Sequence, residues 1–236
     1  MSEPKRPCAG FDWPALREAL ESEGHVRVPG LLEGDRCEAL AALYEEVTLF
    51  RKTVSLDRHR FGSGEYRYFD APLPADVDAL RRDLYEALAP VANIWHQRMG
   101  LEERFEGSLD AYLRRCHAGG QAQPTPLLLR YGADGFNCLH QDLYGERAFP
   151  IQLTVMLSRP GVDFEGGEFL LVEQRPRQQS RGEAFALEQG EAIVFANRER
   201  PVAGTRGDYR AQVRHGVSRV RCGVRSTLGI IFHDAK

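Results

Sequence analysis

Short apolar runs follow one another through the second half of this 236-residue chain, and turn-forming residues close each of them. Runs rich in β-branched and aromatic residues between Gly, Pro, Asn and Asp are typical of the strands of a sandwich or barrel. The runs cover residues 127–131, 136–142, 150–158, 166–170, 191–196, 209–215 and 224–232. The sequence therefore predicts an all-β core over residues 127–233.

Residues 11–120 instead predict a mainly helical layer, because apolar residues recur there at the spacing that places them on one face of a helix. The two stripes are Leu40, Leu43 and Val47, and Val77, Leu80, Leu84 and Leu88. Both are expected to be core faces that pack against the outside of a sheet. Gly62-Ser63-Gly64 is expected to be a loop or hinge. The predicted fold class is α+β, an all-β core with helical additions, with residues 1–236 forming one domain.

Composition agrees with this prediction, since 42% of the residues are hydrophobic and can furnish a sizeable core. The first residues lack the apolar segment of a signal peptide, and nowhere do about eighteen apolar residues run together. Five cysteines without paired spacing indicate reduced thiols rather than a disulfide framework. A cytoplasmic location without a membrane partner is therefore expected.

The tripeptide His140-Gln141-Asp142 is the strongest indication of chemistry. In an extended strand residues i and i+2 share a face, so His140 and Asp142 can present an imidazole and a carboxylate to one metal ion. If His215 supplies the third ligand, the set is two histidines and one carboxylate, which is diagnostic of non-haem Fe(II) oxygenases. Taken singly, each histidine equally fits a core position where its polar atoms are satisfied.

The order of these and neighbouring residues resembles the Fe(II)/2-oxoglutarate-dependent dioxygenase superfamily, which includes prolyl hydroxylases and AlkB-type nucleic-acid demethylases. The resemblance spans residues 127–233. It rests on Tyr131, His140-x-Asp142, Leu157-Ser158, Gly166-Gly167-Glu168-Phe169, His215 and Arg225. A narrower resemblance is to a prokaryotic family of such oxygenases labelled, by kinship, as acting on damaged nucleic acid. Its segments are residues 140–146, 166–169, 214–218 and 229–235.

The resemblance implies a double-stranded β-helix, or jelly roll, buttressed by the N-terminal helices. It also implies an oxidoreductase that uses Fe(II), 2-oxoglutarate and O2. His140, Asp142 and His215 would be the metal-binding, catalytic residues. Arg225 would hold the far carboxylate of 2-oxoglutarate, which a planar guanidinium binds bidentately, and Tyr131 would orient this cosubstrate.

Met156 is a departure from the pattern, because prolyl hydroxylases often carry a tyrosine there that donates to the far carboxylate. A thioether cannot donate a hydrogen bond. Gln152 and Thr154 share a strand face with Met156, and Thr227 lies beside Arg225, so one of these three is expected to take the role.

Other residues with ligand-type side chains are expected to be structural. His117, His233 and Asp234 belong to this group. Cys138 is expected to be a small apolar filler that shares the face of His140.

The primary substrate is not identified by the sequence. The net charge of −3 gives no global attraction to nucleic acid, yet residues 174–225 hold eleven arginines against five acids. That segment either contacts phosphates around the site or forms a solvated face. Arg175, Arg177 and Arg181 are expected to share an inter-strand loop. Residues 198–214 are expected to form a loop that acts as a substrate lid.

Three functions remain open at this point. The first is hydroxylation of a C–H bond by an Fe(II)/2-oxoglutarate dioxygenase, with demethylation of alkylated nucleic acid as one outcome. The second is the same chemistry on a protein or a small metabolite. The third is a cupin-type metal-binding or sensing module without oxygenase activity.

Overall fold

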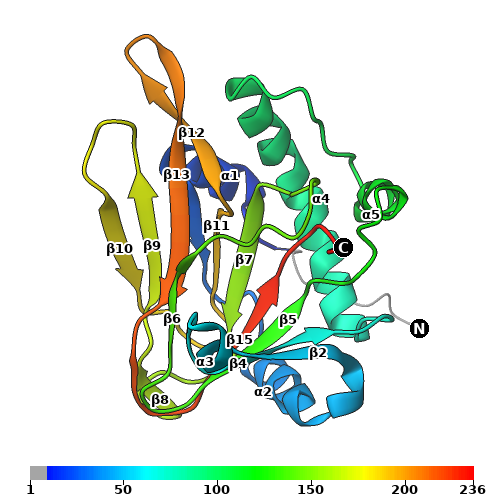
Figure 1. The fold of residues 1–236 in the computed structure, drawn as a ribbon, viewed down its shortest axis with the longest axis vertical. Coiled ribbons are helices and arrows are strands. Elements are labelled where there is room, and N and C mark those ends of the chain that lie inside the picture. Colours follow the sequence, from blue (N-terminus) through cyan, green and yellow to red (C-terminus); the bar gives the residue numbers. More distant parts are fainter. Residues whose placement is uncertain (1–9) are drawn as a thin grey trace.

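The computed structural model of this chain describes residues 10–236 and places most of its strands in two antiparallel sheets (Figure 1). The larger sheet has the order β1-β11-β7-β15-β5-β4-β2 and the smaller one has the order β10-β9-β13-β6-β3. The strand β12 pairs with β13, and β8 pairs with β14 in a separate ribbon. The two sheets face each other across shared side chains, since the rings of Phe169 on β9 and Phe195 on β11 lie 4.8 Å apart. This is the predicted jelly roll.

The strands of the larger sheet are β1 (His25–Val28), β2 (Phe50–Ser55), β4 (Glu65–Phe69), β5 (Leu127–Tyr131), β7 (Ile151–Met156), β11 (Ala192–Ala196) and β15 (Arg225–Ile230). The strands of the smaller sheet are β3 (Gly62–Ser63), β6 (Phe136–His140), β9 (Phe169–Gln174), β10 (Arg181–Phe185), β12 (Glu199–Gly204) and β13 (Gly207–Val217). The ribbon consists of β8 (Phe164–Gly166) and β14 (Val220–Gly223).

The helices are α1 (Trp13–Glu23), α2 (Gly34–Ala42), α3 (Leu56–His59), α4 (Ala75–Arg98) and α5 (Leu109–Ala118), with short 3-10 turns at Leu43–Glu45 and Val47–Leu49. The apolar stripe of α4 is buried as expected. Its Tyr85 ring lies 5.0 Å from that of Phe149 and 5.9 Å from that of Phe232, so the helix packs directly on residues that flank the larger sheet. In this way α4 supports the larger sheet, whose strands β7 and β15 carry Gln152 and Arg225.

The first half of the chain also supplies strands, most of which the sequence did not predict. β1 pairs with β11 and β4 pairs with β5, so both extend the larger sheet. Gly62–Ser63, expected as a loop or hinge, is the strand β3, which pairs with β6. Val47, expected on a core face, is 66% exposed. The α-helix α2 ends at Ala42 and 3-10 turns follow it, so the α-helical spacing that would place Val47 with Leu40 is not maintained. Within the described residues, the helices all fall short of the length and apolar character needed to cross a bilayer.

Candidate iron and cosubstrate site

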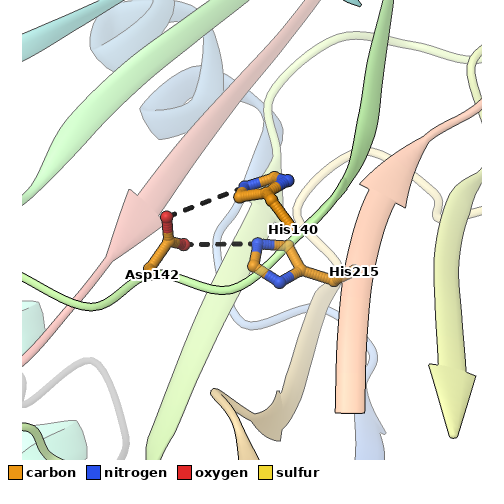
Figure 2. Close-up of side chains that lie close together, drawn as sticks. All are labelled: His140, Asp142 and His215. Carbon is orange, nitrogen blue, oxygen red and sulfur yellow. Dashed lines mark ion pairs between the residues drawn. The ribbon is translucent and has the colours of Figure 1, made fainter. Parts of the chain in front are cut away.

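His140, Asp142 and His215 meet at one point between the two sheets (Figure 2). Their ligand atoms all lie within 4.8 Å of one another. His140 Nε2 is 3.7 Å from Asp142 Oδ1, and His215 Nε2 is 3.2 Å from Asp142 Oδ2. The three predicted ligands therefore converge, and among the described residues they form a cluster of the kind that holds a metal ion.

Strand pairing positions both histidines, because His215 on β13 lies directly opposite His140 at the end of β6. The next pair is Val217 with Asn137, so β6 contains one residue more than β13 between the two pairs. Such a bulge re-aims side chains beside active sites. It turns both Asn137 and His140 into the same cavity, although they are three residues apart. It also leaves Cys138 exposed, which corrects the expectation of a buried filler.

A second contact fixes the ring of His140. Its Nδ1 lies 2.7 Å from the carbonyl oxygen of Cys138, and since a carbonyl only accepts, Nδ1 carries the proton. Nε2 is then the ring nitrogen that faces Asp142 and is placed to bind a metal. A metal-ligating histidine ordinarily donates its other ring N–H in this manner.

Asp142 does not lie in a strand, contrary to the expectation, because β6 ends at His140. The side chain of Asn197 holds it instead. Asn197 Nδ2 donates to the Asp142 carbonyl at 2.7 Å, and Asn197 Oδ1 accepts from the Asp142 backbone N–H at 3.1 Å. This buried amide replaces the neighbouring strand that Asp142 lacks.

Two further side chains contact the carboxylate of Asp142. The hydroxyl of Tyr144 donates to Oδ1 at 2.6 Å, and Gln152 Nε2 donates to Oδ2 at 2.9 Å. Gln152 Nε2 also lies 3.2 Å from His215 Nε2. The amide of Gln152 therefore lies beside the three ligands, and its predicted contact with the cosubstrate stays a prediction.

The electrostatics favour the protonation states that a metal needs. Burial, with the nearby His140 as a lesser cause, lowers the pKa of His215 and keeps its imidazole neutral. Burial alone would raise the pKa of Asp142, but its hydrogen bond with His215, the closeness of both histidines and the hydrogen bond from Tyr144 outweigh burial and hold that pKa below its usual value. A neutral imidazole and an ionised carboxylate are the forms that bind metal.

Arg225 opens β15 opposite Tyr131, the last residue of β5. Its side chain is fully buried, and its Nε, Nη1 and Nη2 have no hydrogen-bond partner within residues 10–236. The guanidinium carbon lies 5.6 Å from the centre of the Tyr131 ring. Burial lowers the pKa of Arg225 to about 10, so the group still carries its charge at neutral pH. A buried cation of this kind requires an anion.

The second glycine of the sequence motif, Gly167, makes room for this arginine. Gly167 has φ +63°, and a Cβ built there would lie 2.7 Å from Arg225 Cδ and 3.0 Å from Val220 Cγ2. Any larger residue would press on the arginine in a left-handed backbone conformation that favours glycine. The motif thus shapes the pocket wall and supplies no ligand.

One cavity of about 490 Å³ joins the three ligands to Arg225. Tyr131, Gln152, Thr154 and Thr227 line it, whereas Met156 does not. The Tyr131 hydroxyl accepts from Asn137 Nδ2 at 3.3 Å, so its own proton is free to point elsewhere. Burial raises the pKa of Tyr131 to about 12, which keeps it a donor.

The residues present fit iron and 2-oxoglutarate. Two imidazoles and one carboxylate are the ligand set of non-haem Fe(II) sites, and a planar buried guanidinium suits a carboxylate. Buried polar atoms without a partner in the described chain also gather on this cavity, namely Gln152 Oε1, His215 Nδ1 and the three nitrogens of Arg225.

The residues expected to be structural form a separate network. His117 Nε2 lies 2.8 Å from Asp234 Oδ2, and Arg81 Nη2 donates to Asp234 Oδ1 at 2.8 Å. His233 accepts from the Phe149 backbone N–H at 3.2 Å. These contacts tie the C-terminal segment to α4, and none of these residues lines the cavity.

Of the eleven arginines in residues 174–225, only Arg225 lines the cavity. Six of its arginines pair with acids: Arg175, Arg181, Arg200, Arg210, Arg219 and Arg221. Residues 198–214, expected as a loop and lid, largely form the paired strands β12 and β13. This hairpin lies at the opposite end of the smaller sheet from α3 (Figure 1). It is anchored to α4, since Arg98 Nε donates to Asp208 Oδ2 at 2.8 Å.

Comparison with known families decides the identity of this site. Residues 64–235 match the family Oxygenase-NA, described as an oxygenase catalysing oxidative methylation of damaged DNA. The chain belongs to this family. Two proteins of Mycobacterium tuberculosis, from different strains and both described as uncharacterized, are 48% identical over 190 residues, which is 78% of this chain and 81% of theirs.

Solved structures agree on the fold. A Pseudomonas putida prolyl-4-hydroxylase has a TM-score of 0.55 at 14% identity, with 95% of this chain and 99% of that one covered. A 2OG-Fe(II) oxygenase from Burkholderia pseudomallei has a TM-score of 0.52 at 19% identity, with 97% and 95% covered. The family and the cluster of two histidines and one carboxylate identify a 2-oxoglutarate- and Fe(II)-dependent dioxygenase whose cofactors are Fe(II), 2-oxoglutarate and O2. The non-oxygenase alternative is therefore set aside.

Proposed function

We propose that this dioxygenase oxidises a C–H bond of an N-alkylated base in damaged nucleic acid and thereby removes the alkyl group. The observation that carries the chemistry is the single cavity that joins His140, Asp142 and His215 to the buried Arg225. The family description, which names damaged DNA, supports the substrate class. Hydroxylation of a protein or small metabolite is the alternative outcome of the test below.

The role of each residue follows from its surroundings. His140, Asp142 and His215 would hold Fe(II), which with 2-oxoglutarate and O2 supplies an oxidant for C–H bonds. Arg225 would bind the far carboxylate of 2-oxoglutarate, and Tyr131 would donate its hydroxyl proton to the same end of the cosubstrate. Thr154 and Thr227 on the same cavity wall would complete that contact in place of the tyrosine absent at Met156.

Tyr144 and Asn197 would act as positioning residues. Tyr144 orients one oxygen of the Asp142 carboxylate, while Asn197 fixes the backbone that carries it. The protein's contribution is then orientation and exclusion of water, because the cosubstrate and metal supply the oxidising chemistry.

We also propose that residues 1–236 form one oxygenase domain, because a single cluster of buried residues includes both Leu84 on α4 and Phe195 on β11. A cytoplasmic location is supported by the cysteines of residues 10–236, all four of which are free.

The test is incubation of the protein with Fe(II), 2-oxoglutarate, O2 and oligonucleotides that carry one N-methylated base. Mass spectrometry should show loss of the methyl group, with one succinate formed for each methyl group removed. Succinate without any change in single- or double-stranded DNA or RNA would move the substrate to a protein or metabolite and leave the iron chemistry intact.

A further inference from the structure

Exposed apolar side chains gather at the open end of the cavity. Phe61 is 51% exposed, and Leu139 and Leu143 are each 43% exposed, yet all three line the cavity. A monomeric protein rarely leaves such residues together in water unless they contact a ligand or partner. The mouth therefore fits an apolar or aromatic group that enters toward His140.

Two arginines lie beside this mouth. Arg58, His59 and Arg60 are exposed at the end of α3, immediately before Phe61. No ion pair involves Arg58 or Arg60 among the residues that the structure describes, whereas most arginines of segment 174–225 outside the cavity are paired. Arg60 also lines the cavity.

Backbone hydrogen bonds hold this segment in place. Phe61 N–H donates to the carbonyl of Leu56 at 3.0 Å, which closes the turn after α3. The carbonyl of Phe61 accepts from the Cys138 N–H at 2.7 Å. Phe61 is thus hydrogen-bonded to the strand that carries His140, two residues from the predicted metal ligand. The rings of His59 and Phe61 stack with centroids 5.3 Å apart and planes at 21°.

We propose that residues 58–61, here named the 58–61 lip, are the nucleotide-binding element of this enzyme, an inference that rests on the proposed function. Phe61, backed by His59, offers a flat face on which a base stacks, and Arg58 and Arg60 contact the phosphates beside it. Every base has a π-face, so aromatic stacking combined with cations suits a single-stranded or flipped-out nucleotide. The arginine-rich hairpins of residues 174–225 have no part in this binding.

The test compares two pairs of variants that make the same chemical change. Arg58→Gln with Arg60→Gln removes two cations from the lip, and Arg177→Gln with Arg206→Gln removes two exposed cations from the hairpins. Phe61→Ala removes the aromatic face at the mouth, and Phe136→Ala removes an exposed phenylalanine that does not line the cavity. Thermal unfolding monitored by circular dichroism checks that all variants fold.

Binding is measured on the Fe(II)- and 2-oxoglutarate-loaded protein without O2. The probe is a fluorescent single-stranded oligonucleotide with one N-methylated adenine, titrated at several salt concentrations. Loss of two phosphate contacts should make the slope of log affinity against log salt shallower by about 1.4. Phe61→Ala should weaken binding about tenfold or more, as expected for loss of one stacked base. The hairpin pair and Phe136→Ala should behave like the parent protein.

Three results would overturn the proposal. If the lip variants bind and demethylate like the parent while the hairpin pair loses affinity, the location is wrong and the proposed function stands. If a glutamate-rich peptide displaces the oligonucleotide as well as unlabelled DNA of equal charge does, the lip recognises charge and not nucleotides. If the parent forms succinate but binds no nucleic acid at low salt, the substrate class itself fails.

Discussion

Replacement of Arg225 by methionine is expected to change the stability of the protein and its affinity for 2-oxoglutarate in opposite directions. The guanidinium is fully buried without a hydrogen-bond partner in residues 10–236. Burial lowers its pKa from 12.5 to about 10, and this shift corresponds to about 3 kcal/mol of unfavourable free energy for the charged form in the fold. The protein without cosubstrate bears that cost.

Arg225→Met removes this cost and keeps a side chain of similar length. The lost contact with the Tyr131 ring offsets about 1 to 2 kcal/mol of the gain. The free energy of unfolding without cosubstrate should therefore rise by about 1 to 2 kcal/mol at pH 7. The far carboxylate of 2-oxoglutarate would in turn lose its charge partner, a loss of about 3 to 5 kcal/mol or a hundredfold or more in affinity.

Denaturant unfolding with and without 2-oxoglutarate measures both effects, and isothermal titration calorimetry gives the affinity directly. Arg225→Lys is the matched control, since it keeps the charge and loses the planar fork, and its affinity should lie between those of the parent and the methionine variant. An unchanged 2-oxoglutarate affinity in Arg225→Met would refute the assigned role. Strong destabilisation of the cosubstrate-free variant would show that the arginine already has a partner within the protein.

Three further changes test other parts of the site. Asn197→Ala leaves the backbone of Asp142 without its amide partner, so the Fe(II) dissociation constant should rise about 10- to 100-fold; unchanged metal affinity in a calorimetric titration would count against this. Gly167→Ala puts a Cβ against Arg225 at a positive φ, so the free energy of unfolding should fall by about 1 to 2 kcal/mol and the KM for 2-oxoglutarate should rise. A KM equal to that of the parent would mean that Gly167 does not position Arg225. Burial lowers the pKa of His233 from 6.5 to about 4, so between these pH values the unfolded chain binds more protons than the folded chain. The free energy of unfolding should therefore fall by up to about 3 kcal/mol as the pH drops from 6.5 to 4. Chemical unfolding over this range should show a flatter profile for His233→Gln, and equal profiles would contradict a buried neutral histidine.

The sequence predicted the parts of the site that strand pairing brings together. His140 and His215 are neighbours on β6 and β13, and Arg225 lies opposite Tyr131 on paired strands. Such residues lie on regular strands, and the order of these strands along the chain is the one expected for this fold. The order of the motifs, through its resemblance to the dioxygenase superfamily, was therefore sufficient to predict that they share one pocket.

The sequence did not reveal the residues that act from irregular segments. Asn197 directly follows β11, and Tyr144 lies in the stretch between β6 and β7, so no periodic pattern marks either side chain. The bulge in β6 was equally hidden, because it depends on how β13 pairs with it. An asparagine just after an apolar strand and a tyrosine two residues after a carboxylate ligand were the available signals, but both are common in loops.

The segment of residues 198–214 shows the converse error. Its length and its glycines suggested a loop, yet tertiary pairing made it a hairpin held by Arg98 and Asp208. The proposed 58–61 lip carries a short basic and aromatic sequence that lies far from the motif along the chain. The pairing of β3 with β6 and the hydrogen bond from Cys138 to Phe61 bring it to the mouth of the cavity.

The most direct test of the iron site is succinate formation from 2-oxoglutarate by the parent protein and by Asp142→Ala, with and without added Fe(II). Asp134→Ala is the control, because Asp134 is exposed and does not line the cavity. The parent and the control should form succinate only when Fe(II) is added, and Asp142→Ala should form none while it keeps its circular dichroism spectrum. Near-normal, iron-dependent succinate formation by a folded Asp142→Ala protein would contradict the assignment of the iron ligands.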